Sequence, residues 1–149
     1  MILLDELRVK DVMSPANVCL HREATVAEAV QALVGAAVQG APVLDELDEL
    51  VGVVSTTDLL VAMAPSFRPG KPLDVHALHD LKRQHIHDLV ERSPVTCDET
   101  LGVADACQLM VRERVHRIVV IRANAPVGLV SAIDLVRAVA CLASRMSGR

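Results

Sequence analysis

The stretch Gly52-Val53-Val54-Ser55-Thr56-Thr57-Asp58-Leu59-Leu60 decides how this chain folds, because it recurs as Gly128-Leu129-Val130-Ser131-Ala132-Ile133-Asp134-Leu135-Val136. Each copy reads as an apolar strand end, a serine, an aspartate three residues later and an apolar helix start. A serine and an acid at this spacing form a capping box, which starts a helix. The same junction favours a bound anion, because free backbone N–H groups and the helix dipole point at it. One copy alone would favour simple helix capping, whereas the recurrence favours a functional site.

The recurrence covers most of the chain and indicates a tandem duplication. Residues 26–30 correspond to residues 103–107, which lie 77 positions further on, while the serine motifs are 76 positions apart. We align residues 42–44 with residues 118–120, which places one lost residue in the loop between, where deletions are tolerated.

Each repeat predicts the order strand, helix, strand, strand, helix. Thr25 and Glu28 form a further capping box ahead of an apolar helical stripe: Val26, Val30, Leu33, Val34 and Val38. The predicted extended segments are 17–20 and 95–97, the strand pairs are 42–44 with 50–54 and 118–122 with 127–130, and the turns between them are 45–49 and 124–126. Closing helices are expected to begin at Thr56 and Ala132.

One such repeat is too small to cover its own sheet. We therefore expect an α+β fold in which two pseudo-symmetric β-α-β-β-α repeats pack sheet to sheet. The first repeat spans residues 9–64, a linker with a short helix spans 65–84, and the second repeat spans 85–141. Within the linker, residues 74–84 read as a short polar helix. Its His76 and His79 could share a face and bind metal, but a solvated helix is favoured, because no thiols or carboxylates accompany them.

Composition excludes several functions. Of the 149 residues 52% are hydrophobic but only 1% aromatic, and the formal net charge is -4. A chain without a basic face or aromatic stacking platforms is not expected to bind nucleic acid. The chain shows no Ser/His/Asp set, paired acids or Walker loop, so no catalysis is expected.

The cysteine spacing and the apolar runs indicate in which cellular compartment the protein is expected. The four cysteines lie far apart, which argues against a zinc or redox motif and favours buried, reduced thiols. The first residues reach charge too early for a signal peptide, and the apolar runs are too short to cross a bilayer. A soluble, cytoplasmic protein is expected, with no membrane partner and no cofactor.

The duplicated Gly-x-x-Ser-x-x-Asp motif, Ala41-Pro42-Val43-Leu44-Asp45 and Val115-His116-Arg117-Ile118-Val119-Val120 together resemble the tandem CBS (cystathionine beta-synthase) domain family, whose paired repeats are called Bateman modules. The last stretch is similar to the nucleotide-contacting strand of the gamma subunit of AMP-activated kinase. The resemblance covers roughly residues 9–63 and 85–139. It implies a regulatory module that binds AMP, ADP, ATP or S-adenosylmethionine in clefts between the repeats.

The resemblance also implies roles for the motif residues. The aspartate would bind both ribose hydroxyls, since a carboxylate offers two acceptor oxygens to a diol, and the serine would reach phosphate. These roles fall to Asp134 with Ser131 and to Asp58 with Ser55. His116 is the expected phosphate ligand, because histidine is partly protonated near neutral pH. In place of His116-Arg117 the first repeat has Gly40-Ala41, so a phosphate there would borrow Arg117.

Two nucleotide sites follow. The first site is expected to combine Ser14, Asn17, Val18, Cys19, Val38, His116, Leu129, Ser131, Ile133 and Asp134. The second site is expected to combine Val53, Ser55, Thr57, Asp58, Pro94, Val95, Thr96 and Arg117. Simpler interpretations stay open for some of these residues: a solvated strand edge for His116-Arg117, a turn for Asn17, and packing for Cys19 and also for Cys107.

The leading functional hypothesis is a stand-alone sensor of adenine nucleotides, with a small-molecule nucleotide and an unidentified regulated protein as partners. The alternative is a ligand-free dimerisation or assembly module. A metal-reading module built on the histidines of the linker is a further hypothesis, and an enzyme is disfavoured. A homodimer is expected, because residues 132–146 carry apolar side chains on more than one helical face and large apolar patches are seldom left bare.

Overall fold

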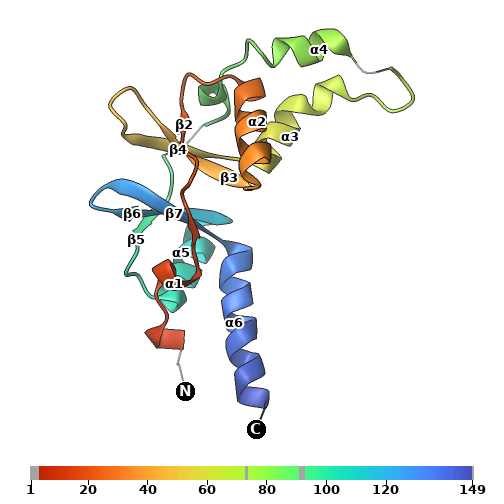
Figure 1. Ribbon diagram of the computed structural model, residues 1–149. Coiled ribbons are helices and arrows are strands. Elements are labelled where there is room, and N and C mark those ends of the chain that lie inside the picture. Colours follow the sequence, from red (N-terminus) through yellow and green to blue (C-terminus); the bar gives the residue numbers. More distant parts are fainter. Residues whose placement is uncertain (1–3, 73, 91–92, 149) are drawn as a thin grey trace. The chain divides into compact units, whose positions relative to one another are not determined.

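The computed structural model describes residues 4–72, 74–90 and 93–148, and its chain forms two compact units (Figure 1). The central unit is Asn17–Ser93, and the terminal unit joins Met1–Ala16 to Pro94–Arg149. Residues 9–16, at the start of the first sequence repeat, therefore pack with the second repeat. Both units combine a small sheet with helices, which confirms the α+β class.

The central unit holds a three-stranded sheet of order β2-β3-β4. Strand β2 pairs with β3 in parallel, and β3 pairs with β4 in antiparallel fashion. The elements are β2 (Leu20–His21), α2 (Val26–Ala36), β3 (Gly40–Leu44), β4 (Leu50–Ser55) and α3 (Thr56–Met63), followed by the 3-10 helix η2 (Ala64–Ser66), α4 (Val75–Asp80) and the 3-10 helix η3 (Ile86–Leu89). The order β2-α2-β3-β4-α3 is the predicted repeat.

The terminal unit holds a four-stranded sheet of order β1-β7-β6-β5. Its second repeat runs β5 (Thr96–Asp98), α5 (Val103–Glu113), β6 (Arg117–Arg122), β7 (Ala125–Ser131) and α6 (Ala132–Ser147). The 3-10 helix η1 (Leu4–Glu6), α1 (Val9–Val12) and β1 (Ser14–Pro15) precede it in the chain. Strand β1, which the sequence did not predict, pairs with β7 in antiparallel fashion.

Capping chemistry fixes where the helices begin. The predicted boxes at Thr25 with Glu28, Ser55 with Asp58 and Ser131 with Asp134 all form, so α2, α3 and α6 start at the expected residues. In each box the side chain of the first residue and that of the acid satisfy backbone N–H groups that have no partner within the helix.

Each unit buries its own aliphatic core. The cluster in the central unit includes Val26, Leu33, Val43, Val54 and Ile86. The corresponding cluster in the terminal unit includes Val9, Val103, Ile118, Val120 and Val130. With almost no aromatic residues available, branched aliphatic side chains on the strands fill both cores.

The strand registers correct the sequence alignment by one residue. Gly40 lies opposite Ser55, whereas Arg117 lies opposite Ser131. Gly40 is therefore the counterpart of Arg117, and the residue before it, Gln39, is the counterpart of His116. The prediction that Gly40-Ala41 replaces His116-Arg117 is wrong, as is the matching of residues 42–44 with 118–120.

The lost residue lies in the hairpin that follows these strands. Both hairpins carry the same irregularity, after Val43 in one repeat and after Val120 in the other. The second hairpin turns at Ala123 and Asn124, whose φ angles are 49° and 66°, as a two-residue hairpin turn of the type I′ class requires. Residues 125 and 126, expected in the turn, instead begin β7.

Two further predictions are corrected in the central unit. Helix α4 ends at Asp80 rather than near residue 84, because the carbonyl of Gln84 accepts a hydrogen bond from the N–H of Val26 and a β-bridge pairs Thr25 with His85. Val34, predicted to belong to the apolar helical stripe of α2, is 73% exposed. None of the helices described over residues 4–72, 74–90 and 93–148 is long and apolar enough to cross a membrane.

Candidate functional site

The serine motif of the terminal unit builds a polar junction between β7 and α6. The backbone N–H and the hydroxyl of Ser131 both donate to Oδ2 of Asp134, at 2.8 Å each. The N–H of Asp134 donates back to the Ser131 hydroxyl at 3.3 Å. Oδ1 is therefore left as the carboxylate oxygen outside the box, and it is the one able to accept from a ligand.

The motif of the central unit repeats this geometry. The N–H and the hydroxyl of Ser55 donate to Oδ2 of Asp58 at 2.8 and 2.9 Å, and the N–H of Asp58 donates to the Ser55 hydroxyl at 3.2 Å. Both motifs thus act as helix caps, as the simpler interpretation requires. Both also keep one carboxylate oxygen for another partner, so capping and ligand binding are compatible.

The segment that leads into β6 lies beside the terminal motif and carries a histidine and an arginine. The carbonyl of His116 accepts a hydrogen bond from the N–H of Ala132 at 2.9 Å, and Arg117 lies opposite Ser131 in the sheet. The side chain of His116 is exposed and that of Arg117 is half-buried. In the central unit the carbonyl of Gln39 accepts from Thr56 at the same distance, 2.9 Å. Neither Gln39 nor the following Gly40 is cationic.

Other predicted site residues of the terminal unit lie along its sheet. Ser14 lies opposite Leu129 at the β1 edge. Thr96 lies opposite Val119 at the β5 edge, and the carbonyl of Val95 accepts from the N–H of Val119 at 3.0 Å. The unit therefore gathers His116, Arg117, Ser131 and Asp134 at one junction, with Ile133 in the first turn of α6. It places Pro94, Val95 and Thr96 at the far edge of the sheet.

The remaining predicted residues lie in the central unit. Asn17, Val18 and Cys19 precede β2, and Val38 follows α2, where its N–H donates to the carbonyl of Leu33. Val53 and Ser55 are on β4, and Thr57 and Asp58 are in the first turn of α3. Of these residues, the structure brings Val53, Ser55, Thr57 and Asp58 to one junction.

Each motif glycine admits a neighbouring segment that a larger residue would exclude. A Cβ atom on Gly128 would lie 2.5 Å from Sδ of Met13 and 2.8 Å from the backbone oxygen of Ser14. On Gly52, a Cβ atom would collide with the side chain of Val90. Gly128 thus lets Met13 and Ser14 lie close to β7, and Gly52 lets Val90 lie close to β4.

Sequence reasoning missed Arg137, which lies one turn after Asp134 on α6. Its Nη1 is 3.8 Å from Oδ1 of Asp134, the oxygen that the capping box leaves over. The signal was present in the sequence, since residues three apart on a helix share a face. The central unit has Val61 at the corresponding position, 76 residues earlier.

The cysteines are all free, but only one of them is buried. Burial, with a smaller contribution from the charge of Asp98, raises the pKa of the Cys97 thiol to about 11, so it stays protonated at neutral pH. Cys107 is half-buried, whereas Cys19 and Cys141 are exposed. The expectation of four buried thiols is therefore wrong for Cys19 and Cys141.

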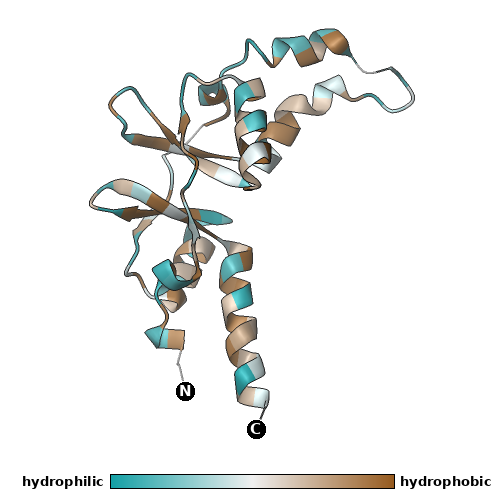
Figure 2. Ribbon diagram, viewed as in Figure 1, coloured by the Kyte–Doolittle hydropathy of each residue, from teal (hydrophilic) through white to brown (hydrophobic). Residues whose placement is uncertain are grey.

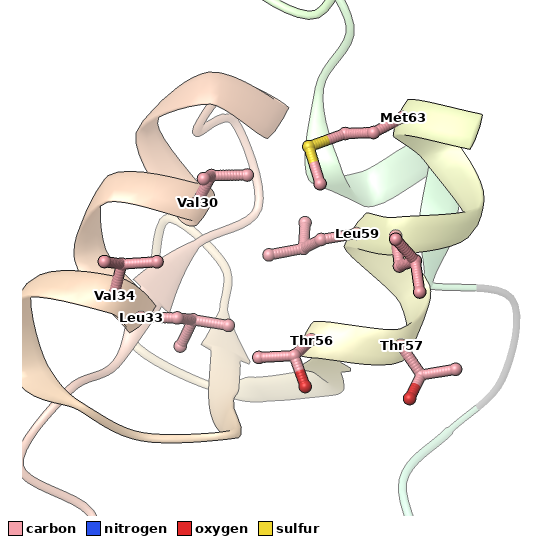
Figure 3. A pocket seen from close by; sticks show the side chains of 8 residues that line it. Val30, Leu33, Val34, Thr56, Thr57, Leu59 and Met63 are labelled. Atoms are coloured by element: carbon pink, nitrogen blue, oxygen red, sulfur yellow. The ribbon is translucent and has the colours of Figure 1, made fainter. Parts of the chain in front are cut away.

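Two apolar grooves lie between helix pairs at matching places in the two repeats. The α2/α3 groove has a volume of about 330 Å³ and is lined by Val30, Leu33, Val34, Leu59, Leu60 and Met63, with Thr56 and Thr57 at its rim (Figure 3). The α5/α6 groove has a volume of about 420 Å³ and is lined by the repeat counterparts Cys107, Met110, Val111, Leu135, Val136 and Val139. These linings are too apolar to hold a nucleotide phosphate, so the grooves and the serine motifs are separate features.

The histidines in and after the linker do not build a metal site in the part of the chain that the structure describes. Among the residues that the structure describes, no three His, Cys, Asp or Glu side chains gather closely enough to hold a metal ion. His85 and His87 stack with ring centroids 5.5 Å apart, and His87 contacts Glu23 and Asp88.

The paired serine motifs and the two β-α-β-β-α repeats define a class of duplicated α+β module. The sequence profile of the CBS domain matches residues 9–65 and again residues 86–141, and the chain belongs to this family. It is a CBS domain pair.

Among its relatives, the chain is 25% identical over 134 residues to inosine-5'-monophosphate dehydrogenase of Methanocaldococcus jannaschii, a match that covers 89% of this chain and 23% of the enzyme. It is 26% identical over 102 residues to a CBS domain-containing protein of Dictyostelium discoideum, covering 68% of this chain and 69% of that protein. The chain thus spans about a quarter of the length of the archaeal enzyme.

Solved structures share the fold. CBSX2 in complex with AMP is 27% identical, with a TM-score of 0.65 and coverage of 91% of this chain and 97% of that one. The CBS domain of a bacterial CNNM/CorC family Mg²⁺ transporter in complex with ATP has a TM-score of 0.70 at 23% identity, covering 92% and 89% of the two chains. The CBS domain pair of MJ0100 with 5'-methylthioadenosine and S-adenosyl-L-methionine has a TM-score of 0.70 at 22% identity, covering 89% and 99%.

Proposed function

We propose that this CBS domain pair is a cytoplasmic regulatory module that binds adenosine-containing ligands at two sites, one at the Asp134 motif and one at the Asp58 motif. The observation that carries the proposal is the paired junction, at which Oδ1 of Asp134 and Oδ1 of Asp58 stand outside their capping boxes. A carboxylate oxygen beside the N-terminus of a helix suits a ribose diol with its phosphate. The related structures with AMP, ATP and S-adenosyl-L-methionine support this class of ligand.

In the first site Asp134 holds the ribose, and Ser131 and His116 reach the phosphate. Ser14, Leu129 and Ile133 of the same unit are the further proposed contacts of the nucleoside. In the second site Asp58 and Ser55 take the ribose and phosphate roles. Val53 and Thr57 lie beside them at the same junction and are the further proposed contacts of that site.

A thermal-shift titration with ATP, ADP, AMP, adenosine and S-adenosylmethionine tests the proposal. Ligand at about a hundred times its dissociation constant stabilises the folded state by roughly 2.7 kcal/mol. The double variant Asp58→Ala/Asp134→Ala should lose the response to every ligand. Absence of any response in the wild-type protein would contradict ligand sensing.

The two apolar grooves favour a second function, in dimerisation and assembly. Their exposed linings include Val34 and Leu60 in one repeat and Val111 and Val136 in the other, each more than half exposed. Figure 2 shows apolar residues along α6, of which Val136, Val139 and Met146 are exposed. A second copy of this chain is the proposed occupant, since matching grooves on two homologous repeats provide the self-complementary surface that a symmetric dimer needs. If no nucleotide binds, assembly alone is the function that remains supported.

A further inference from the structure

The two motif aspartates have the same hydrogen bonds but different neighbours. In each motif, Oδ2 of the aspartate accepts hydrogen bonds from the backbone N–H and the hydroxyl of the serine. Oδ1 of Asp134 then lies 3.8 Å from Nη1 of Arg137, in an ion pair whose acid is 16% exposed and whose cation is 74% exposed. At the place of Arg137 the central unit has Val61, 68% exposed.

The electrostatic consequence is a difference of one unit charge between the motifs. Asp134 together with Arg137 is locally neutral, whereas Asp58 with Val61 keeps the full charge of its carboxylate. An anionic ligand that approaches Asp58 meets an uncompensated negative charge, while one that approaches Asp134 does not. A cationic ligand experiences the opposite preference. Coulomb energy falls as the inverse of distance within about 8 Å, the screening length at physiological ionic strength, so the difference also acts on ligand charges near the ribose.

The strands that pair with the motifs show the same asymmetry. His116 and Arg117 of the terminal unit have Gln39 and Gly40 as their counterparts in the central unit. The arginine opposite Ser131 therefore has no counterpart opposite Ser55.

We infer that Arg137, through its ion pair with Asp134, makes the Asp134 site selective for phosphorylated adenosine ligands over cationic S-adenosylmethionine, and that the Asp58 site lacks this selectivity because Val61 replaces the arginine. This inference rests on the proposed function and adds the ligand charge that each site accepts. Arg137 is a specificity residue and need not touch the ligand.

Calorimetric titrations on single-site proteins test the inference. In the Asp58→Ala background only the Asp134 site remains, and there Arg137→Gln should weaken ATP binding about two- to fivefold, the effect of one charge at an exposed position. Adenosine affinity should change less than about twofold, and S-adenosylmethionine should bind more tightly. Arg137→Lys should restore most of the ATP affinity. Because the side chain of Arg137 is exposed, these variants are expected to fold.

The reciprocal change gives the matched control. In the Asp134→Ala background, Val61→Arg should raise ATP affinity relative to S-adenosylmethionine at the Asp58 site. An unchanged ratio of ATP to S-adenosylmethionine affinity in Arg137→Gln, or an equal loss of ATP and adenosine binding, would overturn the inference while the proposed function stands. If the wild-type protein binds no adenosine ligand, the proposed function fails and the inference fails with it.

Discussion

Asp134 holds both the N–H and the hydroxyl of Ser131 with the single oxygen Oδ2, at 2.8 Å each. The same two side chains start helix α6 and are the proposed ribose and phosphate ligands. To donate to a phosphate, the Ser131 hydroxyl must turn its proton away from Asp134. The backbone N–H of Ser131 can keep its hydrogen bond to Asp134. Ligand binding and helix capping are thus coupled through one rotatable hydroxyl.

The first prediction separates these two roles. Asp134→Ala should abolish nucleotide binding at the first site and lower the free energy of unfolding by about 1 kcal/mol, the usual cost of a lost cap. Glu28→Ala is the matched control, because Glu28 occupies the same place in the capping box of Thr25 but belongs to no proposed site. It should cost similar stability and leave binding intact. Unchanged affinity in Asp134→Ala, with loss only in Asp58→Ala, would reverse the assignment of the sites.

The second prediction concerns His116 and the phosphates. A bound phosphate favours the protonated imidazole, so ATP binding should take up a proton and weaken as the pH rises from 6 to 8. Adenosine carries no phosphate and should show almost no dependence. His116→Gln should flatten the ATP profile and leave adenosine affinity nearly unchanged. Calorimetry at both pH values decides the matter, and equal ATP slopes in the two proteins would remove His116 from the phosphate site.

The third prediction uses the two motif glycines. Gly52→Ala and Gly128→Ala should each destabilise their unit by about 1–3 kcal/mol, as overpacking does. Val90→Ala should relieve Gly52→Ala, because the side chain of Val90 supplies the collision. Met13→Ala should not fully relieve Gly128→Ala, because the backbone oxygen of Ser14 stays 2.8 Å from the new Cβ. Urea unfolding of the single and double variants measures this difference, and equal rescue in both pairs would contradict it.

The local parts of this structure were predictable from the sequence and the non-local parts were not. The starts of α2, α3 and α6 depend on residues three apart, so Thr25, Ser55 and Ser131 could be identified without any tertiary information. Strand register depends on which neighbour a strand pairs with, and apolar β3 and β6 align almost equally well one residue out of step. Because of that ambiguity the sequence alignment matched Gly40 with His116, whereas the structure shows that Gly40 is the counterpart of Arg117.

The same distinction holds for the candidate site. The Ser-x-x-Asp pairs were found by repetition, but the place of Val90 against Gly52 depends on the path of a distant segment. Exposure of Val34 likewise depends on how α2 packs against α3, and no property of its own helix reveals it. Arg137 is different, because it follows Asp134 by three residues and the helical spacing rule alone indicates their contact.

The fourth prediction concerns acid stability. Arg122 donates from Nε and Nη2 to the two oxygens of Glu99, at 2.6 Å each. These hydrogen bonds hold the pKa of Glu99 below its ordinary value of 4.5. A carboxyl group with a lowered pKa stabilises the fold above its unfolded value, and this contribution is lost as the pH falls through the folded value. The stability difference between wild type and Glu99→Gln should therefore shrink below pH 4.5.

Urea unfolding at several pH values between about 3 and 6 measures that difference, over the range in which an ordinary glutamate titrates. The exposed Glu49 provides the control, and Glu49→Gln should not reproduce the pattern. If the difference in free energy of unfolding between wild type and Glu99→Gln stays constant across this range, the ion pair does not contribute to the loss of stability in acid.

The last prediction tests the homodimer through its grooves. Val136→Glu and Leu60→Glu each place a charge on a groove side chain that is 61% or 58% exposed, so the monomer should keep its fold. If a second copy covers these grooves, the buried charge would have no partner and the dimer should dissociate. Leu47→Glu is the matched control, because Leu47 is 78% exposed and lies in the β3–β4 turn outside both grooves. Light scattering at micromolar concentration should show a dimer for the wild type and for Leu47→Glu, and a monomer for at least one groove variant. A wild-type monomer would exclude the dimer, and dimers in all four proteins would move the interface to another surface.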